Sequence, residues 1–320
     1  RPFMVGVDTT IVIPMRDERA TIATMVEVLT TDKPLATRIL LVDAGSTDGT
    51  VQIAQDLART HDLVDVIEVG AVWPGRARNI GVAASSTQWV LLLDAGVDVG
   101  PELVGSLITA RDRQPYARMI IGSYACLSTP RWRSAVIIAT KPPRSECDGH
   151  RGRYDFMPCL IERDFFCALG GFHDWRAGED LDFVRRARSK ANTVICTSNA
   201  RIVWEMAPTR SAMIRKWVTY SFHNARNGTS WHRPVLGYAV LGLGLAAAAY
   251  PLVGWWALSA LLVPHLARTI VRYHRHCCGE DDEVRGGALV FSQALAASLI
   301  ADFATLVGVL RWRVVRGIGR

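Results

Sequence analysis

The sequence predicts an α/β domain with a mixed, mainly parallel sheet, followed by C-terminal transmembrane or interfacial helices. Short apolar runs typical of buried strands recur about every 25 residues early in the chain, and the segments between them have helical periodicity. The last third of the chain is far more apolar than the first two thirds. These observations predict alternating strands and helices in the first domain and membrane contact in the second.

The clearest strand–turn–helix unit covers residues 39–50. Its apolar run ends at Asp43, small residues and glycines follow, and residues 51–57 continue at helical spacing. Such a unit places its chemistry at the carboxyl end of the strand. The Asp43 carboxylate could therefore face a ligand, although an ordinary strand–turn–helix fits this stretch equally well.

The other elements of this domain alternate in the same way. Strands are expected at residues 10–14, 64–69 and 89–93, with helices at 22–29 and from Gly75 onward. Strands that alternate with helices form parallel sheets with right-handed crossovers. The glycine pattern of dinucleotide-binding enzymes is absent after the first strand, which disfavours that class.

Carboxylates follow successive elements of this pattern, at Asp17, Asp43, Asp94 and later Asp180. With their surroundings they resemble family 2 glycosyltransferases of the GT-A fold, over roughly residues 9–205. The matching motifs are Val12-Ile-Pro-Met-Arg-Asp-Glu18, Val42-Asp-Ala-Gly-Ser-Thr-Asp-Gly-Thr50, Ala77-Arg-Asn-Ile-Gly81, Leu92-Leu-Asp-Ala-Gly96, Gly170-Gly-Phe172 and Gly178-Glu-Asp-Leu181.

This resemblance implies a nucleotide-sugar donor, which we expect to be a UDP-sugar. Asp17 and Asp43 would bind the base and ribose, and Arg78 would offset charge on the diphosphate. The full set of expected donor-binding residues is Pro14, Arg16, Asp17, Asp43, Gly45, Ser46, Arg78, Asn79, Asp94, Ala95, Arg215 and Trp217.

The family normally carries a second acid two residues after Asp94, because a divalent cation that bridges phosphates prefers oxygen ligands. Here Gly96 takes that place, and Asp98 is the nearest substitute. We therefore expect Mn²⁺ or Mg²⁺ at Asp94 and Asp98. The alternative is that Arg210 and Arg215 do part of the cation's work.

The resemblance also implies that transfer inverts the sugar and that Asp180 is the general base, with Glu179 beside it. A base must take the proton of the acceptor hydroxyl as its oxygen attacks the anomeric carbon. The alternative is structural, since a Glu-Asp pair at the start of a helix is favoured by the helix dipole.

Two further segments are interpreted as parts of this site or its surroundings. Residues 131–133 and 141–146 are expected to form loops that bind the acceptor. Residues 209–228 are basic and aromatic, and they predict an amphipathic helix in a lipid headgroup layer. Its Arg215-Lys-Trp217 resembles an element of processive membrane relatives, but the glutamine-rich part of that pattern is absent.

The C-terminal region predicts membrane helices. Residues 234–267 are almost uncharged and contain glycines and Pro251, which fits two short helices with a turn near residues 250–254. A second apolar block, residues 286–310, contains Asp302, so an interfacial or re-entrant helix is as good an interpretation as a span. Charge near the helix ends does not decide the topology.

Composition disfavours several other classes of protein. The net charge of +7 comes largely from arginines beside apolar segments, which suits an anionic membrane better than nucleic acid. Seven cysteines without paired spacing argue against disulfides and zinc. No signal peptide is recognised.

The sequence therefore predicts three parts: a glycosyltransferase domain (1–205), a basic interfacial region (206–233), and membrane helices with a basic tail (234–320). The expected enzyme is an inverting glycosyltransferase at the cytoplasmic face of the cell membrane. Its partners would be a nucleotide-sugar donor, a lipid-linked or envelope glycan acceptor and membrane lipid, and its oligomeric state is unknown. The alternative is a catalytically inactive scaffold subunit of a membrane glycan synthase, which Gly96 would favour; a membrane transport component is a weaker third interpretation.

Overall fold

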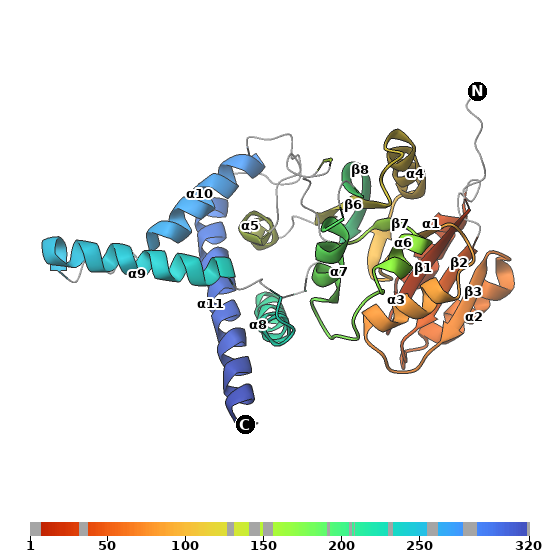
Figure 1. Cartoon of the computed structure of the whole chain (residues 1–320), viewed down its shortest axis with the longest axis horizontal. Coiled ribbons are helices and arrows are strands. Elements are labelled where there is room, and N and C mark those ends of the chain that lie inside the picture. Colours follow the sequence, from red (N-terminus) through yellow and green to blue (C-terminus); the bar gives the residue numbers. More distant parts are fainter. Residues whose placement is uncertain are drawn as a thin grey trace. The chain divides into compact units, whose positions relative to one another are not determined.

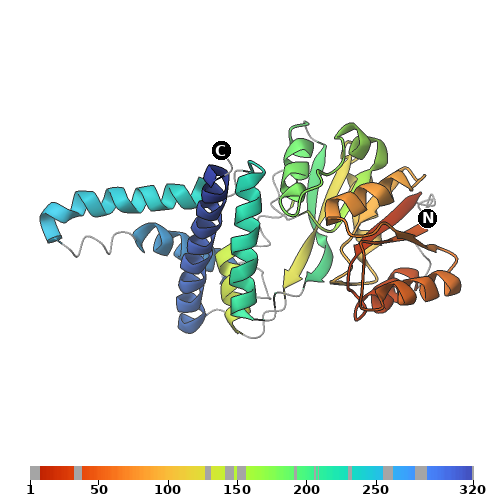
Figure 2. The same cartoon turned by 90° about the horizontal axis from the view of Figure 1, so that it is seen from below.

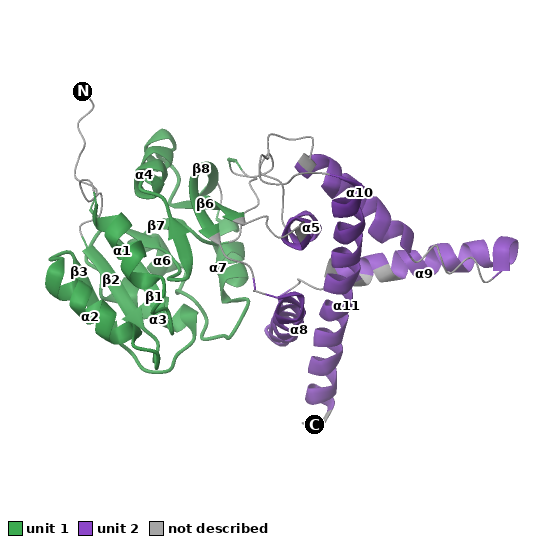
Figure 3. Ribbon diagram, turned by 180° about the vertical axis from the view of Figure 1, so that it is seen from behind, with its two compact units in different colours: residues 1–125, 146–205 green, residues 126–145, 206–320 purple. Residues whose placement is uncertain are grey.

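The computed structural model describes residues 8–31, 38–126, 131–140, 148–149, 156–190, 193–204, 207, 209–229, 233–254, 262–277 and 287–318. The chain forms two compact units (Figure 3). Unit 1 comprises residues 1–125 and 146–205, and unit 2 comprises residues 126–145 and 206–320. The three sequence-based domains remain a prediction.

Unit 1 is an α/β domain with an eight-stranded sheet (Figure 1). Its strands are β1 (Thr9–Met15), β2 (Arg38–Asp43), β3 (Val64–Glu68), β4 (Trp89–Leu92), β5 (Val97–Val99), β6 (Met119–Cys126), β7 (Cys159–Glu162) and β8 (Val194–Trp204). Its helices are α1 (Ile22–Thr30), α2 (Thr50–Thr60), α3 (Pro74–Ala83), α4 (Leu103–Arg113), α6 (Arg163–Ala168) and α7 (Glu179–Arg188). The expected strands and helices of the first hundred residues are all present.

The sheet is mixed, with strand order β3-β2-β1-β4-β7-β6-β8-β5. β3, β2, β1 and β4 are parallel, whereas β7 pairs antiparallel with β4 and with β6. The chain leaves β1 toward β2 on one side, and it later returns as β4 on the other side of β1. Ligands of open α/β sheets bind at such a switch point, outside the carboxyl ends of the strands.

Helix α3 packs closely on β1 and β2 because it has a glycine at the contact. A Cβ atom at Gly81 would lie 2.3 Å from Cγ1 of Val12 and 3.1 Å from Cγ2 of Val42. Both valines are fully buried. The missing side chain therefore sets the distance between helix and sheet, and with it the position of Arg78 and Asn79 on α3.

Unit 2 consists of helices: α5 (Arg131–Thr140), α8 (Arg210–Arg226), α9 (Arg233–Val253), α10 (Val263–Cys277) and α11 (Ala288–Ile318). Figures 1 and 2 show α11 beside α8 and α10. α9 ends at Val253, within residues 250–254 where the sequence predicts a turn, and α10 starts at Val263. Within the described residues, Ala288–Gly317 is long and apolar enough to cross a membrane, and Val240–Val253 is a shorter apolar helix.

The expected loop at residues 131–133 is wrong. These residues begin α5, which packs against α10 and α11 in unit 2. The physical reason is the apolar run that follows, because residues 135–139 are all buried and need neighbouring helices to cover them. Residues 141–146, the second expected acceptor loop, lie outside the described residues.

Candidate active site

The ends of β1 and β2 are joined by a network of loop hydrogen bonds. Asp43 is buried, and its carboxylate accepts from the backbone N–H groups of Gly45 (2.9 Å) and Ser46 (3.1 Å) and from the Ser46 hydroxyl. Asp17 has a left-handed backbone (φ 58°), and its carboxylate accepts from the N–H of Thr47 at 2.8 Å. Its own N–H donates to Ser46 Oγ at 3.0 Å. These contacts hold the two strand ends in one register.

The expected donor residues at these ends differ in exposure. Pro14 is buried within β1, whereas the Arg16 and Asp17 side chains are about half exposed. The carboxylate of Asp43 accepts hydrogen bonds from its own loop. In this arrangement Asp43 shapes the loop, while Arg16 and Asp17 remain accessible to a ligand.

Arg78 links two acids that are far apart in the sequence. Its guanidinium is buried and donates to Asp94 Oδ1 (Nη2, 2.6 Å) and to Glu179 Oε1 (Nη1, 3.3 Å). Asp94 follows β4, and Glu179 opens α7. The guanidinium of Arg78 therefore connects the end of the parallel sheet with the Glu-Asp motif.

Burial and charge act on these groups in opposite directions. Burial lowers the pKa of Arg78, but the attraction of Asp94 and Glu179 outweighs it, so the pKa of Arg78 is raised. Burial, and then repulsion from Asp180, raises the pKa of Glu179 to about 7, although Arg78 opposes this shift. Glu179 thus changes charge near neutral pH.

Asp180 lies in the first turn of α7 and is half buried. Its Oδ1 accepts from the N–H of Leu181 at 2.8 Å. Gly178 starts the helix with a left-handed backbone (φ 84°), which glycine adopts without strain. Gly75 of α3 approaches this turn, since a Cβ there would lie 3.0 Å from Cγ of Glu179. Close packing of α3 on α7 therefore sets the position of the Glu-Asp pair.

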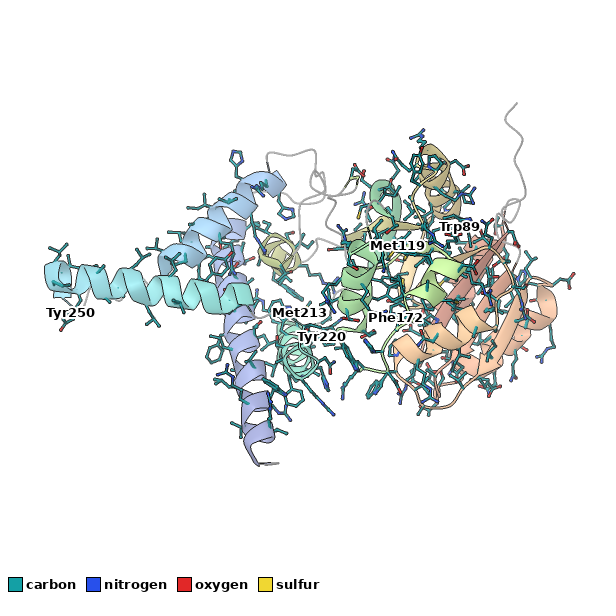
Figure 4. All side chains as sticks on the ribbon, in the orientation of Figure 1. Trp89, Met119, Phe172, Met213, Tyr220 and Tyr250 are labelled. Atoms are coloured by element: carbon teal, nitrogen blue, oxygen red, sulfur yellow. The ribbon has the colours of Figure 1, made fainter. Side chains whose placement is uncertain are left out.

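Asn79 fixes the turn that precedes α7. Its amide donates to Phe172 O (2.8 Å) and accepts from Phe172 N (2.9 Å). A Cβ on Gly171 would lie 2.7 Å from Asn79 Oδ1, so a glycine is needed there. Phe172, labelled in Figure 4, packs on Phe156, Phe166 and Phe183. Asn79 thus has a structural role that the sequence did not reveal.

The two expected metal ligands lie in different segments of the chain. Asp94 follows β4, whereas Asp98 is exposed on β5, which pairs with β8. Within the described residues, no group of three His, Cys, Asp or Glu side chains could hold a metal ion. A different acid, Glu18, lies beside Gly96, because a Cβ at Gly96 would be 3.1 Å from its Oε1.

Sequence reasoning missed two groups at this site. Glu18 is half buried, and burial raises its pKa together with the charges of Asp94, Asp48 and Asp17. Its only sequence signal is its place in the motif after β1. Asp182 is buried and binds Arg185 (2.6 Å) and Arg186 (2.7 Å), a pair that helical spacing could have indicated.

Arg186 in turn holds the turn before α7 by donating to Gly171 O at 2.7 Å. Burial raises the pKa of Asp182, but hydrogen bonds from Arg185 and Arg186 outweigh it and lower the pKa. Arg215 and Trp217, also expected at the donor site, lie on α8 in unit 2, where Arg215 is exposed and Trp217 half buried. Their part in donor binding remains a prediction.

Part of this chain is similar to known glycosyltransferases. Residues 10–160 match the family model described as Glycosyl transferase family 2. The uncharacterized glycosyltransferase YibD of Escherichia coli is 28% identical over 99 residues, which span 31% of this chain and 29% of YibD. The chain thus matches less than a third of the length of that curated relative.

Two solved structures share the fold at low sequence identity. The mannosyltransferase PcManGT of Pyrobaculum calidifontis, solved with GDP-Man and Mn²⁺, has a TM-score of 0.56 and 16% identity, covering 93% of this chain and 87% of its own. S. aureus TarS 1-349, solved with UDP-GlcNAc, has a TM-score of 0.54 and 13% identity, covering 95% and 92%.

The fold and the comparisons show that residues 10–160 of this protein form a domain similar to those of glycosyltransferases. More particularly, residues 10–160 match the model of family 2 glycosyltransferases, and the fold is GT-A-like; the match lies in the parallel half of the sheet and continues to the start of β7.

Proposed function

We propose that this enzyme transfers a sugar from a UDP-sugar to a lipid-linked or cell-envelope glycan acceptor, with inversion at the anomeric carbon. The donor would lie at the carboxyl ends of β1, β2 and β4, where Arg16 and Asp17 are accessible. The observation that carries the proposal is the Arg78 bridge, which joins Asp94 at the sheet to Glu179 beside Asp180. Donor-side and base-side residues thereby belong to one site.

In this mechanism Asp180 is the general base. It takes the proton of the acceptor hydroxyl while that oxygen attacks the anomeric carbon, and the bond to the diphosphate breaks on the opposite face. Glu179 accepts a hydrogen bond from Arg78, so its proposed role is to position α7. A divalent cation, Mn²⁺ or Mg²⁺, would offset charge on the leaving diphosphate when bound near Asp94.

The nucleoside of the donor, uridine or guanosine, can be tested by binding. S. aureus TarS was solved with UDP-GlcNAc and PcManGT with GDP-Man, so the shared fold accommodates either nucleoside. We favour UDP and propose to titrate the full chain with UDP and GDP by calorimetry, with Mn²⁺, with Mg²⁺ and with EDTA. Tighter binding of GDP would refute the uridine donor, and binding of neither nucleotide would favour the inactive scaffold.

The variant Asp180→Asn tests the mechanism. Nucleotide release from the preferred sugar donor would be measured with a membrane lipid extract as the acceptor source. We expect UDP affinity to persist while turnover falls about 10²–10⁴-fold, the usual contribution of a general base. Exposed Asp164 on α6 provides the matched control, Asp164→Asn, which should retain wild-type turnover. Unchanged turnover in Asp180→Asn would remove Asp180 from the mechanism.

The membrane part of the proposal is supported by the distribution of polarity in unit 2. On α10 the apolar residues Leu266, Ile270 and Val271 are exposed, whereas Thr269 is buried and donates toward Ser298 of α11. α11 repeats this pattern, with Phe303 69% exposed and Asp302 buried. A helix with its apolar side outward is typical of contact with hydrocarbon.

Asp302, a buried acid of unit 2, is paired. Asp302 binds Arg268 of α10 through two hydrogen bonds (3.1 and 2.5 Å), and the Arg268 guanidinium lies 4.7 Å from the ring centroid of Tyr238 on α9. An acid within an apolar helix is costly unless it faces protein in this way. Tyr250, labelled in Figure 4, is exposed near the end of α9.

We therefore place the enzyme at the cell membrane, multi-pass or partly interfacial, with the catalytic domain on the cytoplasmic side where nucleotide sugars are made. Extraction of isolated membranes with alkaline carbonate tests this placement. We expect the full chain to stay in the membrane pellet, as inserted proteins do. Complete release into the supernatant would refute insertion of α9–α11.

A further inference from the structure

The second acid of the metal motif is missing from the chain, but a carboxylate occupies its space. Gly96 stands two residues after Asp94, and a Cβ atom built there would lie 3.1 Å from Oε1 and 3.3 Å from Oε2 of Glu18. The side chain of an acid at residue 96 would therefore point to where the Glu18 carboxylate already lies. Glu18 follows β1 and Gly96 follows β4, the neighbouring strands at the switch point of the sheet.

Glu18 is held in this place by contacts on either side. Its backbone N–H donates to Thr50 Oγ1 at 2.8 Å, and its Oε2 accepts from the Thr21 hydroxyl at 3.0 Å. No lysine, arginine or histidine forms an ion pair with it in the described ranges. A half-buried carboxylate near Asp94, Asp48 and Asp17 and without a cation partner is an unfavourable arrangement that a bound cation would relieve.

The donor set fits a divalent cation of the kind proposed above. Mg²⁺ in phosphate-transfer sites commonly takes one or two carboxylates, substrate phosphate oxygens and water, without an all-protein cage. Two carboxylates are therefore enough, which agrees with the absence of a three-ligand protein group among the described residues. Asp98, by comparison, is exposed on β5, which pairs with β8.

We propose that Glu18 supplies the second carboxylate of the divalent cation site, beside Asp94 and in place of an acid at residue 96. This inference rests on the proposed nucleotide-sugar function. It assigns the cation to the ends of β1 and β4 together. The simpler structural role of Glu18 is at the start of α1, where its carbonyl oxygen accepts from the N–H groups of Thr21 and Ile22 (both 3.1 Å).

The test measures Mn²⁺ binding directly. Free Mn²⁺ would be followed by electron paramagnetic resonance in titrations of the UDP-saturated full chain. Glu18→Gln should weaken Mn²⁺ binding by at least about tenfold. Loss of a residue that only hydrogen-bonds to a metal ligand already costs about 10–100-fold, so loss of a ligand should cost no less. UDP binding in EDTA should be unchanged. Glu27→Gln, the same substitution on the exposed side of α1, should bind Mn²⁺ like the wild type.

A second variant relocates the carboxylate. In Glu18→Ala/Gly96→Asp the space beside residue 96 is free, and the backbone of Gly96 is not left-handed, so an aspartate fits there. This aspartate should restore Mn²⁺ binding to within about threefold of the wild type, whereas Glu18→Ala alone should not bind Mn²⁺ in this way. Circular dichroism and thermal unfolding would verify that each variant folds.

The outcomes separate the two levels of the proposal. Wild-type Mn²⁺ affinity in folded Glu18→Gln would overturn the assignment and leave Glu18 with its structural role in α1. Loss of Mn²⁺ binding that Gly96→Asp does not restore in Glu18→Ala would also overturn it. Failure of the wild type to bind UDP at all would instead refute the proposed function.

Discussion

Glu179 predicts a pH dependence of stability that a single substitution should remove. Its carboxyl is buried between Arg78 and Asp180, and its pKa is raised from 4.5 to about 7. In the unfolded chain the group would titrate near its ordinary pKa. The folded protein therefore binds a proton at Glu179 more tightly than the unfolded chain does, and Glu179→Gln replaces the group by a neutral one of the same shape.

The sign and size of the effect follow from this difference. The stabilisation from protonated Glu179 is fully present below about pH 4.5 and is lost as the pH rises through about 7. The shift of about 2.5 pKa units, taken from 4.5 to about 7, corresponds to roughly 3.5 kcal/mol at about 1.4 kcal/mol per unit. As the pH rises from 5 to 8, the free energy of unfolding of Glu179→Gln should therefore increase by about 2–3 kcal/mol relative to that of the wild type.

The assay must report on unit 1 alone. Urea unfolding at pH 5, 6, 7 and 8 would be followed by a hydrogen-exchange pulse at one fixed pH and mass spectrometry of peptides from β1 and β7. The quantity compared is the difference in free energy of unfolding between variant and wild type at each pH. Glu102→Gln, exposed at the start of α4, should show a constant difference. A constant difference for Glu179→Gln would mean that Glu179 keeps one charge throughout, which would refute the reasoning.

Two further predictions concern packing and buried charge. Gly81→Ala should destabilise unit 1 by about 1–3 kcal/mol, because its Cβ would lie 2.3 Å from Val12 Cγ1 and overpacking outweighs the higher helix propensity of alanine. The urea midpoint of peptides from unit 1 measures this change, and a stabilised variant would contradict the prediction. Asp302→Ala should destabilise the helices of unit 2 by about 3–5 kcal/mol, because it leaves Arg268 buried without its partner. Thermal unfolding in detergent measures this loss, and a shift no larger than that of exposed Phe303→Ala would argue against a role for the ion pair.

Much of unit 1 could be predicted because its signals are local. The apolar runs that become β1–β4 and the helical spacing of α1 and α2 lie within short windows of sequence, and parallel pairing follows from their alternation. A helix start was the alternative interpretation of the Glu-Asp motif, and α7 begins with Glu179.

The contacts that assemble the site could not be predicted in this way. Arg78 meets Glu179 across 101 residues, and Glu18 meets Gly96 because β1 and β4 are neighbours in the sheet. Asp98 was expected as the second ligand because it is near Asp94 in sequence, whereas no local pattern connects Glu18 with Gly96. Likewise, residues 131–133 were expected to form a loop, because the helices that cover the apolar residues after them come much later in the chain.

The sequence by itself determined the alternation of strands and helices, the acids at the strand ends and the apolar character of the C-terminal helices, since period and composition decide these features locally. Only the tertiary structure decided which acids meet, which glycines permit close packing, and that polar side chains of α10 and α11 lie inside while apolar ones lie outside. Such contacts depend on strand order and helix packing, which bring together residues that no local pattern connects.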